Sequence, residues 1–358
     1  MLSIEHSTAN ISACDVRSEN RFELTIRPEN TPINDSAWYG FRVDPKTSGT
    51  LRVTLKYKDG EHRYNPKLSY DGQNWTVLPK SKTKAVGDDT LNMRLDLDGR
   101  SFYVSAQEIM TKEVHDSWSA KIASKPFVTA SIIGESVDGY PIQMLEAKSG
   151  VEKKPYVMFV GRQHPPEITG ALALMPFVET VLGDGKLAKD FRENFNILIV
   201  PNMNPDGVTA GHWRHNMGGV DLNRDWGPFT QPETQAIKRV LKRFEDGSDK
   251  IAFFLDFHST KRNLLYTHTD AEVTNPPMFS RDWLEAVDAR LDDKVYFFTR
   301  EANKKSEQKN SKNYMYEAFG IPAITYEVGD ETDRKSIQIS AKIFAEEMMR
   351  LLLEHEEK

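Results

Sequence analysis

The chain has 358 residues, of which 39% are hydrophobic and 28% charged, and its net charge is −6. This composition is typical of a globular protein rather than a disordered one, and the length is sufficient for two domains. With 47 basic residues against 53 acidic ones, the sequence has no excess of positive charge for a nucleic-acid backbone. Because the sequence shows neither a signal-peptide pattern nor an apolar run of about 18 residues, we expect no membrane association.

Cysteine is represented once, by Cys14, so the chain has no partner for an internal disulfide and no thiolate cluster for a metal. A single cysteine without a signal-peptide pattern favours a reducing, cytoplasmic location. Any metal site in this protein must therefore use the nine histidines and the acidic residues.

The first 110 residues or so consist of short segments with alternating, β-branched or aromatic residues. We expect strands at Arg21–Ile26, Trp38–Val43, Thr50–Tyr57, Asn74–Leu78, Leu91–Leu97 and Ser101–Ser105. Asp-Gly pairs at 59–60, 71–72 and 98–99 favour the positive φ angles of tight hairpins. These features predict a small all-β sandwich domain over residues 1–120, with a helical or loop-like connection from Ala106 to about Ser124.

From about Lys125 the pattern changes to compact apolar runs separated by helical stretches. The runs, which we expect to be buried strands, are Tyr156–Val160, Asn196–Val200, Ile251–Phe257 and Ala323–Val328. The helices are expected at Glu167–Leu182, Gln231–Phe244 and Ser336–Glu354. This alternation predicts an α/β domain over residues 121–358, with a mixed, mostly parallel sheet and helices on both faces.

Histidine and glutamate residues follow the predicted strands at the points where those strands end. His164 and Glu167 come after the first run, His258 after the third, and Glu327 lies near the end of the fourth. In open α/β sheets, ligands bind beyond the carboxyl ends of the strands. His164, Glu167 and His258 would form a three-ligand zinc site with an open position for water. The spacing of His164 and Glu167 alone also fits a carboxylate at a helix N-terminus, so it is His258 that favours the metal.

The most specific stretch is HWRHNMGGVDLNRDW, from His212 to Trp226. Together with HPPE at 164–167, NPDG at 204–207, FHS at 257–259 and TYE at 325–327, it resembles the zinc metallocarboxypeptidases of the carboxypeptidase A-like superfamily. The RQHPPE form of the first motif, with ELTIRPEN and WYGFRV in the β-rich region, resembles the cytosolic carboxypeptidase subfamily, including its bacterial members.

The resemblance implies a zinc carboxypeptidase fold, a single bound Zn²⁺ and a peptide or protein C-terminus as the substrate. His164, Glu167 and His258 would bind the zinc. Glu327 would act as the general base on the zinc-activated water and would pass the proton to the leaving amine.

The resemblance also implies roles for residues in the long motif. Arg214 would stabilise the developing oxyanion, and Asn223 and Arg224 would hold the terminal carboxylate of the substrate. Asp221 would orient His164 by accepting a hydrogen bond from its second ring nitrogen.

A basic segment bears on substrate preference. Between Arg300 and Lys312 the sequence has five basic residues and two acidic ones, and in related enzymes this region lines the pocket for the C-terminal side chain. A basic pocket would favour a C-terminal Glu or Asp, whereas a solvated loop would have no such effect. Because residues 301–310 contain no tyrosine, we assign no catalytic tyrosine.

Two other functions are compatible with the motifs. One is an N-acyl-amino-acid amidohydrolase, such as a desuccinylase or aspartoacylase, and the other is a non-catalytic peptide-binding homologue. The set WR…GVDLNR with NPDG favours a peptidase, and the presence of all three ligands and of Glu327 favours an enzyme. Nothing in the sequence indicates the oligomeric state.

Overall fold

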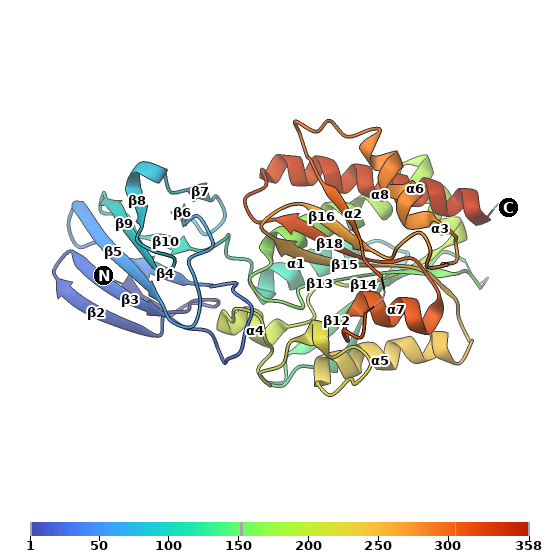
Figure 1. The fold of residues 1–358 in the computed structure, drawn as a ribbon, viewed down its shortest axis with the longest axis horizontal. Coiled ribbons are helices and arrows are strands. Elements are labelled where there is room, and N and C mark those ends of the chain that lie inside the picture. The colour runs from blue at the N-terminus through green and yellow to red at the C-terminus, as the bar shows by residue number, and fades with distance from the viewer. Residues whose placement is uncertain (1, 151–152, 305, 357–358) are drawn as a thin grey trace. The chain divides into compact units, whose positions relative to one another are not determined.

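The structure is a computed structural model that describes residues 2–150, 153–304 and 306–356. Contacts divide the chain into two compact units. The first comprises residues 1–112, 164–166 and 206–219, and the second comprises residues 113–163, 167–205 and 220–358. The N-terminal part is β-rich and the remainder is a mixed α/β structure (Figure 1), so the predicted fold class is confirmed.

In the N-terminal part, the described strands form two sheets. One has the order β1-β4-β10-β6-β7 and the other the order β2-β3-β5-β9-β8. The strands are β1 (Leu2–Ser3), β2 (Ala13–Ser18), β3 (Arg21–Ile26), β4 (Gly40–Val43), β5 (Gly49–Tyr57), β6 (Lys67–Ser69), β7 (Thr76–Val77), β8 (Thr83–Ala85), β9 (Thr90–Leu97) and β10 (Phe102–Ser105), with a 3₁₀ turn η1 at Lys80–Lys82. Alternate residues such as Leu51, Val53 and Leu55 of β5 are buried, as the period of a β-strand requires.

The three Asp-Gly pairs do not all close hairpins. Asp59, Gly72 and Gly99 have positive φ angles of 61°, 73° and 90°. Only the pair at 71–72 connects two strands that pair with each other, β6 and β7. The pair at 98–99 leads from β9 to β10, which lie in different sheets, and the pair at 59–60 follows β5, whose partners are β3 and β9. The local conformation was predicted correctly, but long-range pairing decides which strands a turn connects.

The second part of the chain contains a sheet whose described strands have the order β11-β12-β14-β13-β15-β18-β16-β17. Its strands are β11 (Val128–Glu135), β12 (Pro141–Ala147), β13 (Tyr156–Gly161), β14 (Asn196–Val200), β15 (Ile251–Thr260), β16 (Leu264–Thr267), β17 (Thr299–Ala302) and β18 (Ala323–Gly329). The central strands β14, β13, β15 and β18 are parallel, whereas β12 and β16 run antiparallel to their neighbours in this group. The four predicted apolar runs form this central group.

The helices are α1 (Lys112–Ala123), α2 (Ile168–Val181), α3 (Lys186–Asn194), α4 (Pro205–Ala210), α5 (Pro232–Glu245), α6 (Phe279–Asp288), α7 (Ser311–Phe319) and α8 (Arg334–Glu356), with a 3₁₀ turn η2 at Leu222–Arg224. Two hydrophobic cores lie on opposite faces of the sheet. One core joins the sheet to α1, α2, α3, α6 and α8, and the other joins it to α5 and α7. Figure 1 shows α2, α6 and α8 on one side of the sheet and α5 and α7 on the other. Burial on both faces explains why the central strands are continuously apolar.

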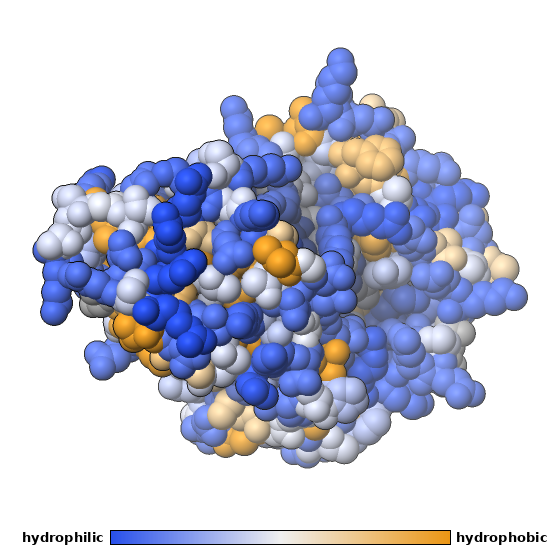
Figure 2. Space-filling view, turned by 60° about the vertical axis from the view of Figure 1, so that its left-hand side comes forward, coloured by the Kyte–Doolittle hydropathy of each residue, from blue (hydrophilic) through white to orange (hydrophobic). Residues whose placement is uncertain are grey.

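The face of the molecule shown in Figure 2 is mostly hydrophilic. On the face shown in Figure 2, hydrophobic residues occur in small, separate groups among hydrophilic ones. Among the described residues, none of the helices combines the length and the apolar composition needed to cross a membrane.

Candidate functional site

Two of the predicted ligands lie between β13 and α2. His164 and Glu167 are buried in the loop that leaves the carboxyl end of β13, and Glu167 immediately precedes the first residue of α2. The first turn of α2 packs closely on β15, because a side chain at Gly170 would come within 2.6 Å of the carbonyl oxygen of His258. The backbone N–H of Gly170 donates to Oγ of Ser259 at 2.8 Å. A glycine at this position therefore lets the helix bring Glu167 close to β15.

The third ligand and the proposed base lie on neighbouring parallel strands. His258 of β15 is in register with Glu327 of β18, and Asp256 is in register with Thr325. Phe254 lies an even number of residues before His258, and Ala323 an even number before Glu327, so each shares a sheet face with its partner on the strand. Phe254 and Ala323 belong to the core on the α5 and α7 side. Since side chains alternate along a strand, His258 and Glu327 project from that face at the carboxyl ends of their strands.

The three predicted ligands come together in a buried cluster. One ligand atom from each of His164, Glu167 and His258 lies within 4.8 Å of the others, and Nδ1 of His258 lies 2.7 Å from Oε2 of Glu167. Two imidazoles and one carboxylate form a donor set suited to zinc, which binds nitrogen and oxygen ligands and keeps a fourth position open in catalytic sites. These residues therefore fit a zinc ion.

A second carboxylate, which the sequence reading had not singled out, faces the other nitrogen of His258. Oδ2 of Asp256 lies 2.9 Å from Nε2 of His258, and the side chain of Asp256 is 0% exposed. A metal-binding histidine commonly donates its second N–H to a carboxylate, which fixes the ring and its tautomer. The geometry assigns Nδ1 of His258 to the metal and Asp256 to the opposite nitrogen. The motif DFHS contained the signal, because residues two apart on a strand share a face.

Asp256 also joins several segments around the cluster. Its Oδ2 accepts a hydrogen bond from Nε2 of Gln163 at 2.6 Å and another from the hydroxyl of Ser311. Oε1 of Gln163 in turn accepts from Nε1 of Trp226 at 2.9 Å. A buried carboxylate costs free energy unless hydrogen bonds compensate it, so this network stabilises the charge of Asp256 and fixes the start of α7 beside β15.

The electrostatics of the cluster combine carboxylates with a buried arginine. Burial lowers the pKa of His258, but the adjacent carboxylates of Asp256 and Glu167 raise it well above its usual range. Arg162 has a positive φ of 53° and is fully buried, and burial lowers its pKa to about 9 although the charge of Glu167 opposes this change. The cation of Arg162 thus lies near the ligand Glu167 and offsets part of the negative charge.

His115 of α1 lies next to this arginine. Nη1 of Arg162 lies 3.3 Å from Nε2 of His115. Burial lowers the pKa of His115 well below its ordinary value, and the charge of Arg162 lowers it further. His115 is therefore neutral near pH 7, and its ring can accept a hydrogen bond from the guanidinium.

The residues proposed to bind the substrate carboxylate lie in and around the turn η2. Oδ1 of Asp221 accepts from the backbone N–H of Asn223 at 2.9 Å, which caps this turn. Nδ2 of Asn223 lies 3.3 Å from Nε2 of His258, and its Oδ1 accepts from the N–H of Ser311 at 2.9 Å. Asn223 thus lies next to the predicted ligand His258. Arg224 is exposed and donates to the carbonyl of Asn223 at 2.7 Å.

The described basic residues between Arg300 and Lys312 differ in their exposure and in their partners. Arg300 is engaged by Asp270, at 2.5 Å, and by the carbonyl oxygen of His268, at 3.1 Å. Lys304 and Lys309 are exposed, and Lys305 lies outside the described residues. Lys312 is buried, with 5% of its surface exposed. It directly follows Ser311, whose hydroxyl donates to Asp256.

Two tyrosines, Tyr314 and Tyr266, bear on the question of a catalytic tyrosine. The hydroxyl of Tyr314 donates to Oε1 of Glu245 at 2.7 Å. Tyr266 of β16 is in register with Thr325. Burial raises the pKa of Tyr266, and the carboxylates of Glu327 and Glu301 raise it further. Tyr266 is therefore a tyrosine that lies within electrostatic range of the proposed base.

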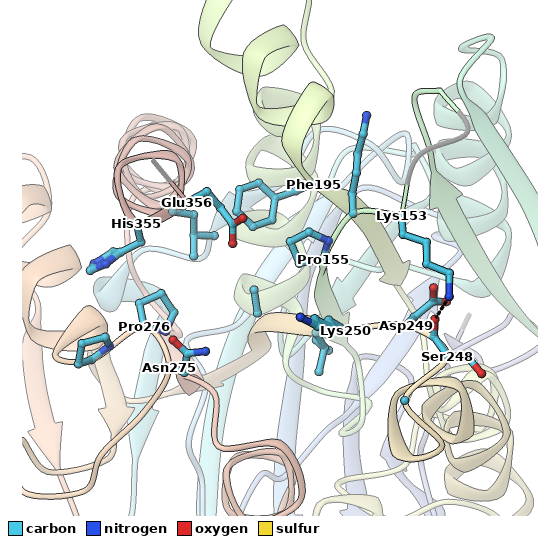
Figure 3. Close-up of a pocket in the computed structure, with 16 residues that line it drawn as sticks. Lys153, Pro155, Phe195, Ser248, Asp249, Lys250, Asn275, Pro276, His355 and Glu356 are labelled. Atoms are coloured by element: carbon cyan, nitrogen blue, oxygen red, sulfur yellow. Dashed lines mark hydrogen bonds between the residues drawn. The ribbon is translucent and has the colours of Figure 1, made fainter. Parts of the chain in front are cut away.

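A separate cavity of about 750 Å³ lies at the opposite ends of the same strands. Its lining includes Pro155 before β13, Phe195 before β14, and Ile251 at the start of β15. Figure 3 shows this cavity with Lys153, whose Nζ donates to the carbonyl of Ser248 at 3.0 Å. It contains none of the residues predicted to act in the site.

The fold and the cluster together define a class of protein, namely α/β proteins with a three-ligand zinc site at the carboxyl edge of a mixed sheet. The family profile described as zinc carboxypeptidase matches residues 115–349 of the chain. A second profile, described as the cytosolic carboxypeptidase N-terminal domain, matches residues 4–106. The chain therefore belongs to the zinc carboxypeptidase family, and the resemblance seen in the motifs is confirmed.

Relatives of known sequence support the same family. Cytosolic carboxypeptidase 6 of Mus musculus is 29% identical over 284 residues, which cover 70% of this chain and 52% of that protein. An uncharacterized protein of Zymomonas mobilis is 25% identical over 246 residues, which cover 67% of this chain and 62% of that protein. The alignments thus span about half to three fifths of these relatives.

Solved structures show the same fold. A metallo-carboxypeptidase from Burkholderia cenocepacia superposes with a TM-score of 0.81 at 21% identity, covering 100% of this chain and 98% of its own. A metallo-carboxypeptidase from Pseudomonas aeruginosa, in complex with (2-guanidinoethylmercapto)succinic acid, has a TM-score of 0.80 at 20% identity and covers 99% and 100% of the two chains. At these identities the likeness concerns the fold.

Proposed function

We propose that this chain is a zinc-dependent carboxypeptidase that hydrolyses the C-terminal peptide bond of peptides or protein tails. The observation that carries the proposal is the buried cluster of His164, Glu167 and His258, with Glu327 in register with His258 on the next strand. When bound, zinc polarises a carbonyl and lowers the pKa of water to about 7, which supplies a nucleophile at neutral pH.

Glu327 is the general base in this proposal. It takes a proton from the attacking water and gives it to the nitrogen of the leaving amino acid. Its place on β18 supports this role, because its side chain shares a sheet face with the ligand His258 and is itself not one of the three clustered ligands.

Four residues of the long motif have supporting roles in this proposal. Arg214 stabilises the oxyanion that develops on the scissile carbonyl, and Asn223 and Arg224 bind the terminal carboxylate. The contact of Asn223 with His258 supports a place for the carboxylate near the metal ligands. Asp221 orients His164, in the way that Asp256 is placed to orient His258.

The substrate in this proposal ends in Glu or Asp, and Lys312 is the residue that recognises that side chain. Lys312 is buried one residue after Ser311, whose N–H is bound by Asn223. Burial lowers the pKa of its ammonium to about 8, in opposition to the carboxylate of Glu272. A buried cation has lost hydration and gains more from a carboxylate partner than an exposed one.

The activity is tested with the variant Glu327→Gln, assayed on short peptides with zinc-loaded protein. We expect bound zinc to be unchanged and kcat to fall about 10²- to 10⁴-fold, because the general base is lost. Glu193→Gln, which changes an exposed carboxylate on α3, is the matched control and should leave kcat unchanged. Equal rates for wild type and Glu327→Gln would remove Glu327 from the mechanism. Hydrolysis of N-acyl amino acids without hydrolysis of peptides would instead support an amidohydrolase.

The acidic preference is tested by comparing peptides that differ only in a C-terminal Glu, Lys or Phe. We expect the highest kcat/KM for Glu, because Lys312 adds an attraction that the other two side chains lack. Faster release of Lys or Phe would overturn the proposed preference without affecting the proposed chemistry.

Two further points stay predictions. The division into domains at residues 1–120 and 121–358 rests on the sequence pattern. A cytoplasmic location is supported by the relatives named as cytosolic carboxypeptidases, and fractionation of cells that express the protein would test it.

A further inference from the structure

The segment that carries Arg214 is held by residues from the beginning of the chain. Within the first unit, the N–H of Thr8 donates to the carbonyl of Thr209 at 2.8 Å. Nδ2 of Asn10 donates to the carbonyl of Gly211 at 2.7 Å. The residues of this segment, 206–219, are therefore fixed by partners some 200 positions earlier in the sequence.

The tightest of these contacts is made by Glu29. Its carboxylate accepts hydrogen bonds from the backbone N–H groups of three consecutive residues: Trp213 at 2.7 Å, Arg214 at 2.9 Å and His215 at 2.6 Å. The side chain of Glu29 is 7% exposed. Charge-assisted hydrogen bonds to a carboxylate are among the strongest in proteins, so Glu29 fixes the backbone on both sides of Arg214.

Neighbouring contacts strengthen this arrangement. Oδ1 of Asn30 lies 2.6 Å from Nδ1 of His215, and Nδ2 of Asn30 donates to the carbonyl of Gly219 at 3.0 Å. The ring of Trp213 packs so closely on Gly60 that a Cβ at residue 60 would lie 2.3 Å from it. The residues that flank Arg214 are thus fixed through their backbone, through His215 and through Trp213.

We propose that Glu29 is a positioning residue for Arg214, so that the β-rich N-terminal region takes part in catalysis by fixing the arginine backbone. The inference rests on the proposed function, in which Arg214 stabilises the oxyanion. Such stabilisation depends on a donor that is already in place when the charge develops. A displacement of about 1 Å can cost on the order of 100-fold in rate. Arginine has a long, flexible side chain, so an anchored backbone limits the positions that its guanidinium can reach.

The effect of Glu29 on the backbone of residues 213–215 can be measured without any substrate. Hydrogen exchange in Glu29→Ala should be faster at the amides of residues 213–215, because their acceptor is gone. Glu19→Ala, which removes an exposed carboxylate from the same unit, is the matched control and should leave these amides unchanged. Unchanged exchange in Glu29→Ala would overturn the inference.

The catalytic part is measured by kinetics on zinc-loaded protein. We expect Glu29→Ala to lower kcat about 10- to 100-fold with little change in KM and with unchanged zinc content, because the lost interaction acts mainly in the transition state. In an Arg214→Ala background, the same substitution should have less than a twofold further effect. Independent, multiplicative losses in the double variant would overturn the role through Arg214.

A second substitution keeps the inference testable if Glu29→Ala does not fold. Gly60→Ala retains the carboxylate and displaces the ring of Trp213, so it should lower kcat with unchanged KM and zinc content, by a smaller factor. An unchanged kcat in this variant would count against the inference. If wild-type protein fails to hydrolyse any peptide, the proposed function fails and the catalytic role of Glu29 fails with it. If wild type is active but Glu29→Ala and Gly60→Ala retain its kcat, only the positioning role is wrong.

Discussion

The two ends of the central parallel strands differ sharply in what they carry. At the carboxyl ends, His164, Glu167, Asp256 and His258 are all buried. His258 lies 2.7 Å from Glu167 and 2.9 Å from Asp256. At the amino ends lies the cavity of about 750 Å³, whose lining includes prolines and exposed lysines such as Lys250.

Buried, convergent polar groups indicate a functional site better than the volume of a cavity does. Burying charged groups is costly unless they are paired or bind a metal, so a cluster of them at one sheet edge points to a function. Among the described residues that line it, the cavity at the amino ends has no such cluster of buried charged groups.

Removal of the metal should abolish hydrolysis. A chelator should lower kcat/KM by at least about 10³-fold, because the nucleophile is no longer activated, and added zinc should restore it. Peptide hydrolysis and metal analysis on the same samples provide the measurement. Full activity in protein shown to be free of metal would contradict the function assigned to the carboxyl ends.

Asp256→Asn should weaken zinc binding by about 10- to 100-fold, because the second nitrogen of His258 loses its carboxylate acceptor. Competition with a chelator of known affinity measures the dissociation constant directly. Lys250→Ala, at the amino ends, is the control and should change neither zinc affinity nor kcat/KM by more than about twofold. Equal zinc affinities for wild type and Asp256→Asn would show that Asp256 does not support the ligand.

Lys312 should make substrate preference depend on pH. Burial lowers its pKa to about 8, so the ammonium is charged below that pH and neutral above it. Groups near Lys312 include Glu272, whose carboxylate opposes the shift, and His268, whose Nε2 lies 3.4 Å from the Lys312 carbonyl. The preference for C-terminal Glu over Ala should therefore be full at pH 7 and decline as pH rises through 8.

Substitutions of Lys312 test whether its positive charge causes this preference, and we expect their effects to be the smallest. Lys312→Ala should lower the Glu preference by about tenfold at pH 7, roughly the 1.4 kcal/mol of one modest ion pair. Lys312→Arg keeps its charge at pH 9 and should retain the preference there. A preference that is the same in wild type and Lys312→Ala would assign recognition to another residue.

Much of the central sheet and of the metal cluster followed from local sequence. β3 and β14 have the predicted bounds, Arg21–Ile26 and Asn196–Val200. The outer strands β11, β12, β16 and β17 were not predicted. β11 and β17 lie at the edges of the sheet, and β12 is only partly buried, so these strands lack the long, continuously apolar run of a central strand. β16 is only four residues long.

The sequence alone predicted that His164, Glu167 and His258 would cluster, because parallel strands place their carboxyl ends at one edge of the sheet. His164 and Glu167 follow β13, and His258 lies near the end of β15. Only the tertiary structure revealed that Glu29 binds the backbone of Arg214, 185 positions away. It also decided that Lys312, among the described basic residues of its segment, is the buried one. Strand periodicity depends on residues that are neighbours in the sequence. A buried hydrogen bond between distant segments depends on how the whole chain packs.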